Sequence, residues 1–297
     1  MKLTILTLLS LVICHMGHSQ DAETQLGDYF SLENTLELFK SSSSLEAFEK
    51  ALNQKDNSVN NLDLNDDGET DFLMVRDEWV DDVHAIVISA IVSDKETQDV
   101  AVIEIEKTGI QEAVLQIIGD EELYEGGSIV EPYEETTTLR GSGPYSPDLY
   151  PRITVNVWFW PSVSSLYRPA YITYRSSWRW GYYPRWWTPW RPLTWNSWHP
   201  IRVRYAPRYR VTSIHRVQRA HRVYAPQRRV SKTVTVKRTS HVSKTREMAT
   251  TNKKSKVVTN KNGTKQGKKT VSKKGVKKAN GTSKKVKKTK TVKRKVN

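Results

Sequence analysis

The residues between Asp63 and Asp71 form a run of oxygen-bearing side chains with the sequence DLNDDGETD. Their spacing, D-x-N-x-D-G-x-x-D, supplies oxygen ligands at loop positions 1, 3, 5 and 9 and a glycine at position 6, where a calcium loop turns sharply. Because a hard cation needs several oxygen ligands, the pattern predicts a Ca²⁺ site. The candidate ligands are Asp63, Asn65, Asp67, Glu69 and Asp71.

This acidic loop (63–71) differs from an EF-hand in two ways. Position 12 would be Met74, so the bidentate glutamate is missing, and a strand rather than a helix is expected to follow. Over nine residues the loop resembles the DxDxDG loops of dockerin-like and FG-GAP-like repeat proteins, and weak affinity is expected. The alternative is a metal-free turn, because Asp, Asn and Gly favour turns without any ion.

A second group of residues that could bind a ligand is aromatic and basic. Nine of the ten tryptophans lie between Trp158 and Trp198, interleaved with arginine and proline. Such rings stack on sugars or bases or lie at a membrane interface, while guanidinium groups pair with anions. The alternative is self-association or packing onto the acidic part of the chain through Arg–Trp contacts. The candidate residues for binding an anionic surface are Trp158, Trp160, Trp178, Arg179, Trp180, Arg185, Trp186, Trp187, Trp190 and Arg191.

The sequence contains no recognised catalytic motif. Neither HExxH nor G-x-S-x-G occurs, and Cys14 is the only cysteine. The histidines at 199, 215, 221 and 241 are scattered among Arg and Val, so no zinc site is expected there. We therefore expect a non-enzymatic protein.

Hydrophobic periodicity predicts the elements that hold the acidic loop. Apolar residues recur at helical spacing around 32–39 and 45–54, and Ser43 with Glu46 has the pattern of a capping box. Val- and Ile-rich runs with short connections predict strands at 71–77, 84–92, 100–106 and 110–118. The expected fold is α+β, with two N-terminal helices on a four-stranded antiparallel meander, within an acidic domain at 20–135.

The rest of the chain has a different composition. Of the 47 Lys and Arg residues, 40 follow Leu139, whereas 30 of the 32 Asp and Glu residues lie between Asp21 and Leu139. Recurrent proline predicts an extended segment at 136–229. The Lys-rich, aromatic-free stretch at 230–297 predicts a disordered tail, with residual strand-like alternation at 230–237. A polycation of this kind binds polyanions.

The N-terminus has the features of an export signal. Lys2 precedes an apolar run from Leu3 to Ile13, and the small residues Gly17 and Ser19 suit cleavage before Gln20. We therefore expect a signal peptide at 1–19 and a mature protein in the periplasm, in the outer envelope or outside the cell. No later segment is apolar enough to predict a membrane span.

Taken together, the signal peptide, the NNLDLNDDGETDFLMV and VAVIEIEKTG runs and the Trp/Tyr/Pro/Arg middle resemble uncharacterised exported proteins of Bacteroidota-type bacteria. The resemblance implies an envelope or secreted location and no activity. The expected partners are anionic polysaccharide, lipopolysaccharide or a membrane surface, and nucleic acid only outside the cell. The alternative is a structural or matrix protein that self-assembles through its oppositely charged halves.

Overall fold

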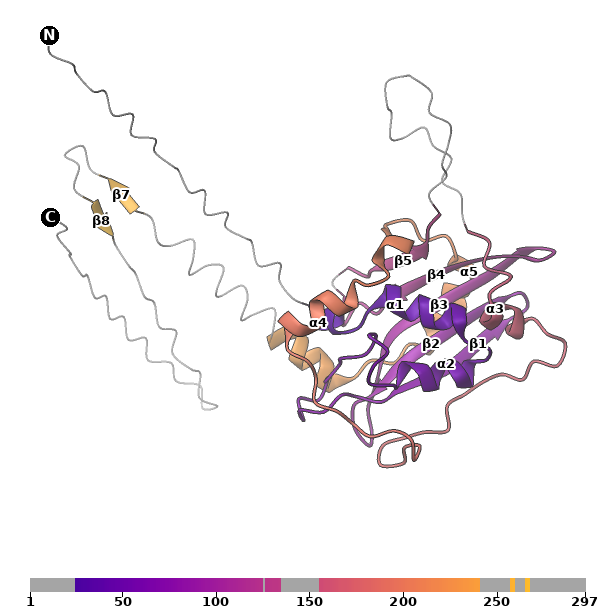
Figure 1. The fold of residues 1–297 in the computed structure, drawn as a ribbon, viewed down its shortest axis with the longest axis horizontal. Coiled ribbons are helices and arrows are strands. Elements are labelled where there is room, and N and C mark those ends of the chain that lie inside the picture. Colours follow the sequence, from indigo (N-terminus) through magenta and orange to yellow (C-terminus); the bar gives the residue numbers. More distant parts are fainter. Residues whose placement is uncertain (1–24, 125, 135–154, 241–256, 260–264, 268–297) are drawn as a thin grey trace, which may run out of the picture.

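Six antiparallel strands form the centre of the protein (Figure 1). The computed structural model describes residues 25–124, 126–134, 155–240, 257–259 and 265–267. The strands lie side by side in chain order. They are β1 (Leu73–Val80), β2 (Val83–Ile91), β3 (Thr97–Gly109), β4 (Glu112–Gly119), β5 (Ile129–Pro132) and β6 (Tyr209–Thr212). The predicted α+β class and the first four strands are confirmed.

The predicted strand number of four is wrong. The two additional strands are only four residues long, and β6 comes from the segment that was expected to be extended. The pairing joins Ile129 to Thr212 across more than 80 residues of chain. Short strands give too few periods for a pattern to be read, and the partner is chosen by tertiary packing.

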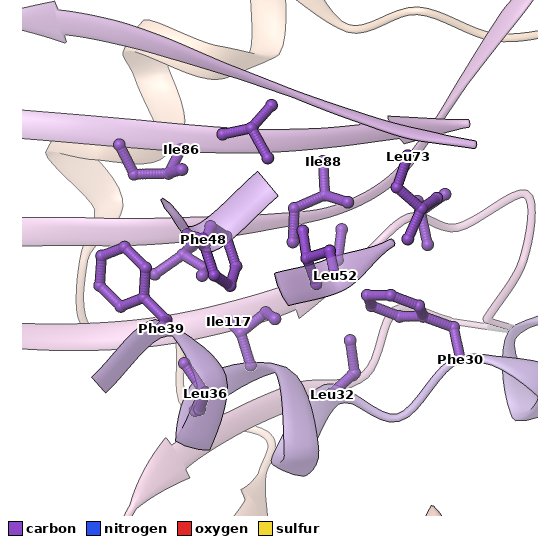
Figure 2. Packing of buried hydrophobic residues seen from close by; sticks show 14 of the residues in the cluster. Phe30, Leu32, Leu36, Phe39, Phe48, Leu52, Leu73, Ile86, Ile88 and Ile117 are labelled. Atoms are coloured by element: carbon purple, nitrogen blue, oxygen red, sulfur yellow. The ribbon is translucent and has the colours of Figure 1, made fainter. Parts of the chain in front are cut away.

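Two helices cover one face of the sheet, as predicted. They are α1 (Leu32–Ser41) and α2 (Leu45–Leu52), preceded by the 3₁₀ turn η1 (Leu26–Tyr29). The Ser44 side chain accepts the N–H of Ala47 and caps α2, so the cap lies one residue after the predicted Ser43. Figure 2 shows the phenylalanines and leucines of these helices packed against the strands. The labelled residues include Phe39, Phe48, Leu52, Ile86, Ile88 and Ile117.

The aromatic-basic segment folds over the sheet instead of remaining extended. It forms α3 (Pro161–Leu166), α4 (Trp195–Arg202), the 3₁₀ turns η3 (Ala206–Arg208) and η4 (Ala225–Gln227), and α5 (Gln218–Tyr224). Residues 232–240 are helical too, where strand-like alternation was predicted. Each helix is too short for local periodicity to predict it, and tertiary contacts stabilise it. α5 packs on the sheet, α3 packs on α1, and Trp198 of α4 donates to the Asp28 carbonyl.

α5 covers the sheet face opposite to α1 and α2. Ile86 and Ile88 belong to the core with those helices, whereas Ala85 and Val87 pack with Tyr224 of α5. Because alternate side chains of a strand point to opposite faces, the sheet lies between two layers. All nine residues of β2 are buried for this reason.

The signal peptide at 1–19, the region 135–154 and most of the predicted disordered tail lie outside the described residues. Within the tail, β7 (Val257–Thr259) and β8 (Lys265–Gly267) pair as a two-stranded antiparallel sheet. Across the described ranges, we find no helix with the length and apolarity needed to cross a membrane.

Candidate functional site

The acidic loop (63–71) folds as a tight turn around its own carboxylates. Asp63 accepts the N–H groups of Asp67 and Gly68 at 3.2 and 3.0 Å, and Asp67 accepts the N–H of Glu69 at 2.8 Å. Gly68 has a φ of +83°, a left-handed conformation that favours glycine. The Glu69 side chain is exposed and forms no hydrogen bond or ion pair with the described residues. Calcium binding stays a prediction.

Asp71 closes the loop from the buried side. Its Oδ2 accepts the N–H of Leu64 at 2.6 Å. Burial raises the pKa of Asp71 to about 8, an effect that the Leu64 N–H opposes and that the nearby Asp63 and Asp67 carboxylates increase. The ammonium group of Lys237, from the helix at 232–240, donates to the Asp63 carbonyl and to Asp66. The structure therefore places several carboxyl groups close together in the acidic loop and brings the ammonium group of Lys237 to them.

Among the described residues after position 155, eight Lys and Arg side chains pair with carboxylates of the acidic part of the chain. Their geometry includes bidentate contacts of Arg175 with Glu78 and of Arg228 with Asp120, at 2.6 to 2.9 Å. The eight pairs are Arg175–Glu78, Arg202–Asp28, Arg208–Glu37, Arg210–Glu131, Arg216–Glu131, Arg228–Asp120, Lys237–Asp66 and Arg238–Glu122. These contacts show that the basic segment packs onto the acidic part of the chain, which was the alternative expectation from the sequence.

A different arrangement occurs in the aromatic–arginine loop, which we define as residues 178–191. Arg179, Arg185 and Arg191 are exposed, and none has an ion pair with a described residue. Trp180 and Trp186 are 40% and 44% exposed, and Arg179 lies over the Tyr182 ring at 4.1 Å. The loop therefore presents exposed rings together with guanidinium groups that no described carboxylate pairs with.

Buried tryptophans anchor this loop to the sheet. Trp187 and Trp190 are 9% exposed and pack on Phe72 and Ile91, with the rings of Phe72 and Trp187 edge to face at 5.1 Å. Thr70 at the end of the acidic loop donates its N–H and hydroxyl groups to the Trp190 carbonyl at 2.8 and 3.0 Å. The acidic loop and the aromatic–arginine loop are thus joined directly.

A groove of about 590 Å³ separates the end of α2 from the aromatic–arginine loop. Its lining includes Lys50, Lys55, Asp56, Trp186 and Trp190. The Lys50 Nζ lies 5.6 Å from the centre of the Trp186 ring. Two ammonium groups and one carboxylate give the groove a net positive charge between aromatic walls, which suits a ligand that combines flat apolar faces with negative charge.

Trp158 and Trp160 lie apart from this surface. Trp160 is 8% exposed and belongs to the main core at the start of α3, and Trp158 stacks on Tyr167 at 5.2 Å. Trp178 is half-buried against the Phe72 cluster. The sequence grouped these rings by proximity along the chain, whereas packing assigns them to different places.

A buried acid–imidazole pair lies on the core side of the sheet. His84 Nδ1 is 2.9 Å from Asp77 Oδ2, and the Tyr171 hydroxyl donates to the same oxygen at 2.7 Å. Both members of the pair are buried beneath aromatic rings. The pair therefore ties β1 to β2 and to the segment around Tyr171 and presents no open reaction centre.

A further cluster was missed by sequence reasoning. Glu104 of β3 lies between His215 and His221, with its two carboxylate oxygens 2.6 and 2.8 Å from their ring nitrogens. The hydrogen bond that Glu104 accepts from His221 raises the pKa of His221, and burial opposes this shift. In the sequence, only the position of Glu104 between two isoleucines of a buried strand could have indicated a special site. The two histidines are distant along the chain and show no pattern that connects them to it.

Comparisons with protein-family models, curated proteins and solved structures each give no match.

Proposed function

We propose that this protein is an exported, non-enzymatic envelope protein that binds anionic surface polysaccharide, including that of lipopolysaccharide. The aromatic–arginine loop (178–191) is the proposed contact surface, together with the groove beside it. The supporting observation is that three exposed arginines without an ion pair among the described residues, Arg179, Arg185 and Arg191, lie beside exposed rings in one loop. Eight other Lys and Arg residues pair with carboxylates of the same chain.

Exposed rings add a second kind of contact to this charge. Trp180, Tyr182 and Trp186 keep 40–62% of their surface exposed, although neighbouring Trp187 and Trp190 are buried. Aromatic faces pack on the apolar faces of sugar rings, and guanidinium groups bind carboxylate or phosphate with two parallel hydrogen bonds. A polysaccharide with acidic substituents offers both features.

The anchoring contact at Thr70 suggests a role for the acidic loop in the same function. Calcium in that loop would stiffen the backbone that holds Trp190, and through it the rim of the groove. The proposed calcium ligands remain Asp63, Asn65, Asp67, Glu69 and Asp71. Binding of anionic glycan does not require the ion in this proposal, since the guanidinium groups supply the charge.

The test compares matched variants of the full mature chain, because the Lys-rich tail binds polyanions independently of the loop. Arg185→Ala and Trp186→Ala are expected to weaken binding to lipopolysaccharide several-fold and to reduce the quenching of tryptophan fluorescence. The controls are Arg175→Ala, an exposed arginine paired with Glu78, and Phe159→Ala, a ring that is 71% exposed elsewhere. Equal binding by the loop variants and the controls would refute the proposed surface.

A further inference from the structure

Glu104 differs from the other buried carboxylates on the α5 side of the sheet. Asp99, Asp120 and Glu131 are each held by guanidinium groups at 2.9 Å or less. Glu106 accepts the N–H groups at the start of α5. Glu104 is completely buried, and within the described residues its side-chain partners are two imidazoles.

The donor atoms of the cluster converge on one point. Glu104 Oε2 lies 2.6 Å from His215 Nε2, and Glu104 Oε1 lies 2.8 Å from His221 Nδ1. One ligand atom from each of the three residues lies within 4.8 Å of the other two. The two rings meet edge to face at 4.9 Å. Three nitrogen and oxygen donors are therefore arranged around a small common volume.

Their environment leaves one side open. The side chains of His215 and His221 are 24% and 43% exposed, whereas Glu104 closes the site from the sheet. Zinc binds imidazole nitrogen and carboxylate oxygen at about 2.0–2.2 Å and keeps a fourth position for water in sites with three protein ligands. Donors at those distances from one ion lie about 3.4 Å apart, so each imidazole nitrogen would separate from the carboxylate oxygen that it contacts by less than about 1 Å.

We propose that Glu104, His215 and His221 bind a divalent transition-metal ion, with Zn²⁺ as the probe, and that an exchangeable water completes its coordination. When the two imidazoles are neutral, they donate hydrogen bonds to Glu104 but bring no positive charge, and an isolated buried carboxylate is costly. A dication supplies that charge. Imidazole and carboxylate together select a transition metal over Ca²⁺, which prefers an all-oxygen site. The proposal is independent of the proposed glycan binding.

The bound ion would join parts of the chain that are distant in sequence. Glu104 lies in β3, His215 precedes α5 and His221 lies within α5. Metal binding would therefore hold the C-terminal layer on the sheet. Zn²⁺ is expected to raise the melting temperature of the wild-type protein.

The experiment is a Co²⁺ titration of the metal-free mature chain, followed by visible absorption. We expect one equivalent to give the d–d bands of a site with nitrogen and oxygen ligands, and Zn²⁺ to displace them. His215→Ala and His221→Ala should each lose the bands. His199→Ala is the matched control, because His199 is an exposed histidine of α4 outside the cluster. Asp67→Ala in the acidic loop should keep the bands, which separates this site from the calcium prediction.

A second measurement uses the unchanged protein, in case the variants fold poorly. X-ray absorption of the Zn²⁺ complex should show two imidazoles and one carboxylate in the first coordination sphere. The proposal is overturned if Co²⁺ gives no bands, if His199→Ala loses them equally, or if the histidine NMR signals titrate with pH and ignore Zn²⁺. That last result would identify a proton-sensitive Glu–His cluster in place of a metal site.

Discussion

At the scale of single residues, Asp67 stabilises the turn of the acidic loop by accepting two hydrogen bonds. The donors are the Glu69 N–H and the Asn65 side-chain amide, whose Nδ2 lies 2.8 Å from Asp67 Oδ2. If the loop binds Ca²⁺, millimolar calcium should raise the melting temperature of the wild-type protein, because ligand binding to the folded state stabilises it. Asp67→Ala should abolish that rise. Asp56→Ala, which changes an exposed aspartate outside the loop, is the control. An unchanged wild-type melting temperature would leave the loop as a metal-free turn.

Asp71 predicts a pH dependence of stability in calcium-free buffer. Its pKa is about 8 in the folded protein, against about 3.9 in an unfolded chain. The folded state therefore binds the proton more tightly, and this contribution to the free energy of unfolding is complete below about pH 4 and lost as the pH rises towards 8.

Asp71→Asn should flatten that dependence, since the amide oxygen can still accept the Leu64 N–H and carries no charge. Urea unfolding at pH 5 and pH 8 measures the difference between wild type and variant. A parallel loss of stability in both proteins would show that other groups control the pH response.

At the scale of elements, the stability of the core depends on the packing of α2 against its neighbours. Phe48 is completely buried and packs edge to face on Phe39 at 5.2 Å. Phe48→Ala should lower the free energy of unfolding by about 3–5 kcal/mol, because it removes apolar burial and leaves a cavity. Phe159→Ala, an exposed ring, should change it by less than about 0.5 kcal/mol. Chemical denaturation monitored by circular dichroism distinguishes the two.

At the scale of the whole molecule, described residues of both the acidic and the basic parts of the chain build the same hydrophobic core. Val157, Val163, Leu166 and Tyr209 belong to the main core, and Tyr224 covers the other face of the sheet. A protein ending at residue 134 would expose these faces.

We therefore expect residues 20–134 alone to bind a hydrophobic dye and to unfold without a sharp transition. Residues 20–240 should unfold in a single transition with little dye binding. Sharp unfolding of the shorter protein would show that the acidic part is an independent domain, as its composition suggested.

Much of the local structure could be predicted because it depends on short-range patterns. Leu32, Leu36 and Phe39 define α1 by their spacing, and the Val- and Ile-rich runs define β1 to β4 with shifts of a few residues at their ends. β6 and α5 could not be predicted in the same way, since their few residues are ordered by contacts with the sheet.

The candidate surface was predicted in part. The sequence located the arginines and tryptophans, but burial divides them, placing Trp187 inside and Trp186 outside although they are adjacent. The backbone turn between them cannot be inferred from composition. The Glu104 cluster combines residues more than 100 positions apart, so no spacing rule connects them.

The sequence alone determined the α+β class, the two N-terminal helices, the first four strands and the division of charge, because periodicity and composition act locally. Only the tertiary structure decided which arginines pair with described carboxylates, and which rings are buried. It also brought His215 and His221 to Glu104. These outcomes depend on long-range packing against a sheet whose two faces must both be covered, and no short stretch of sequence contains that requirement.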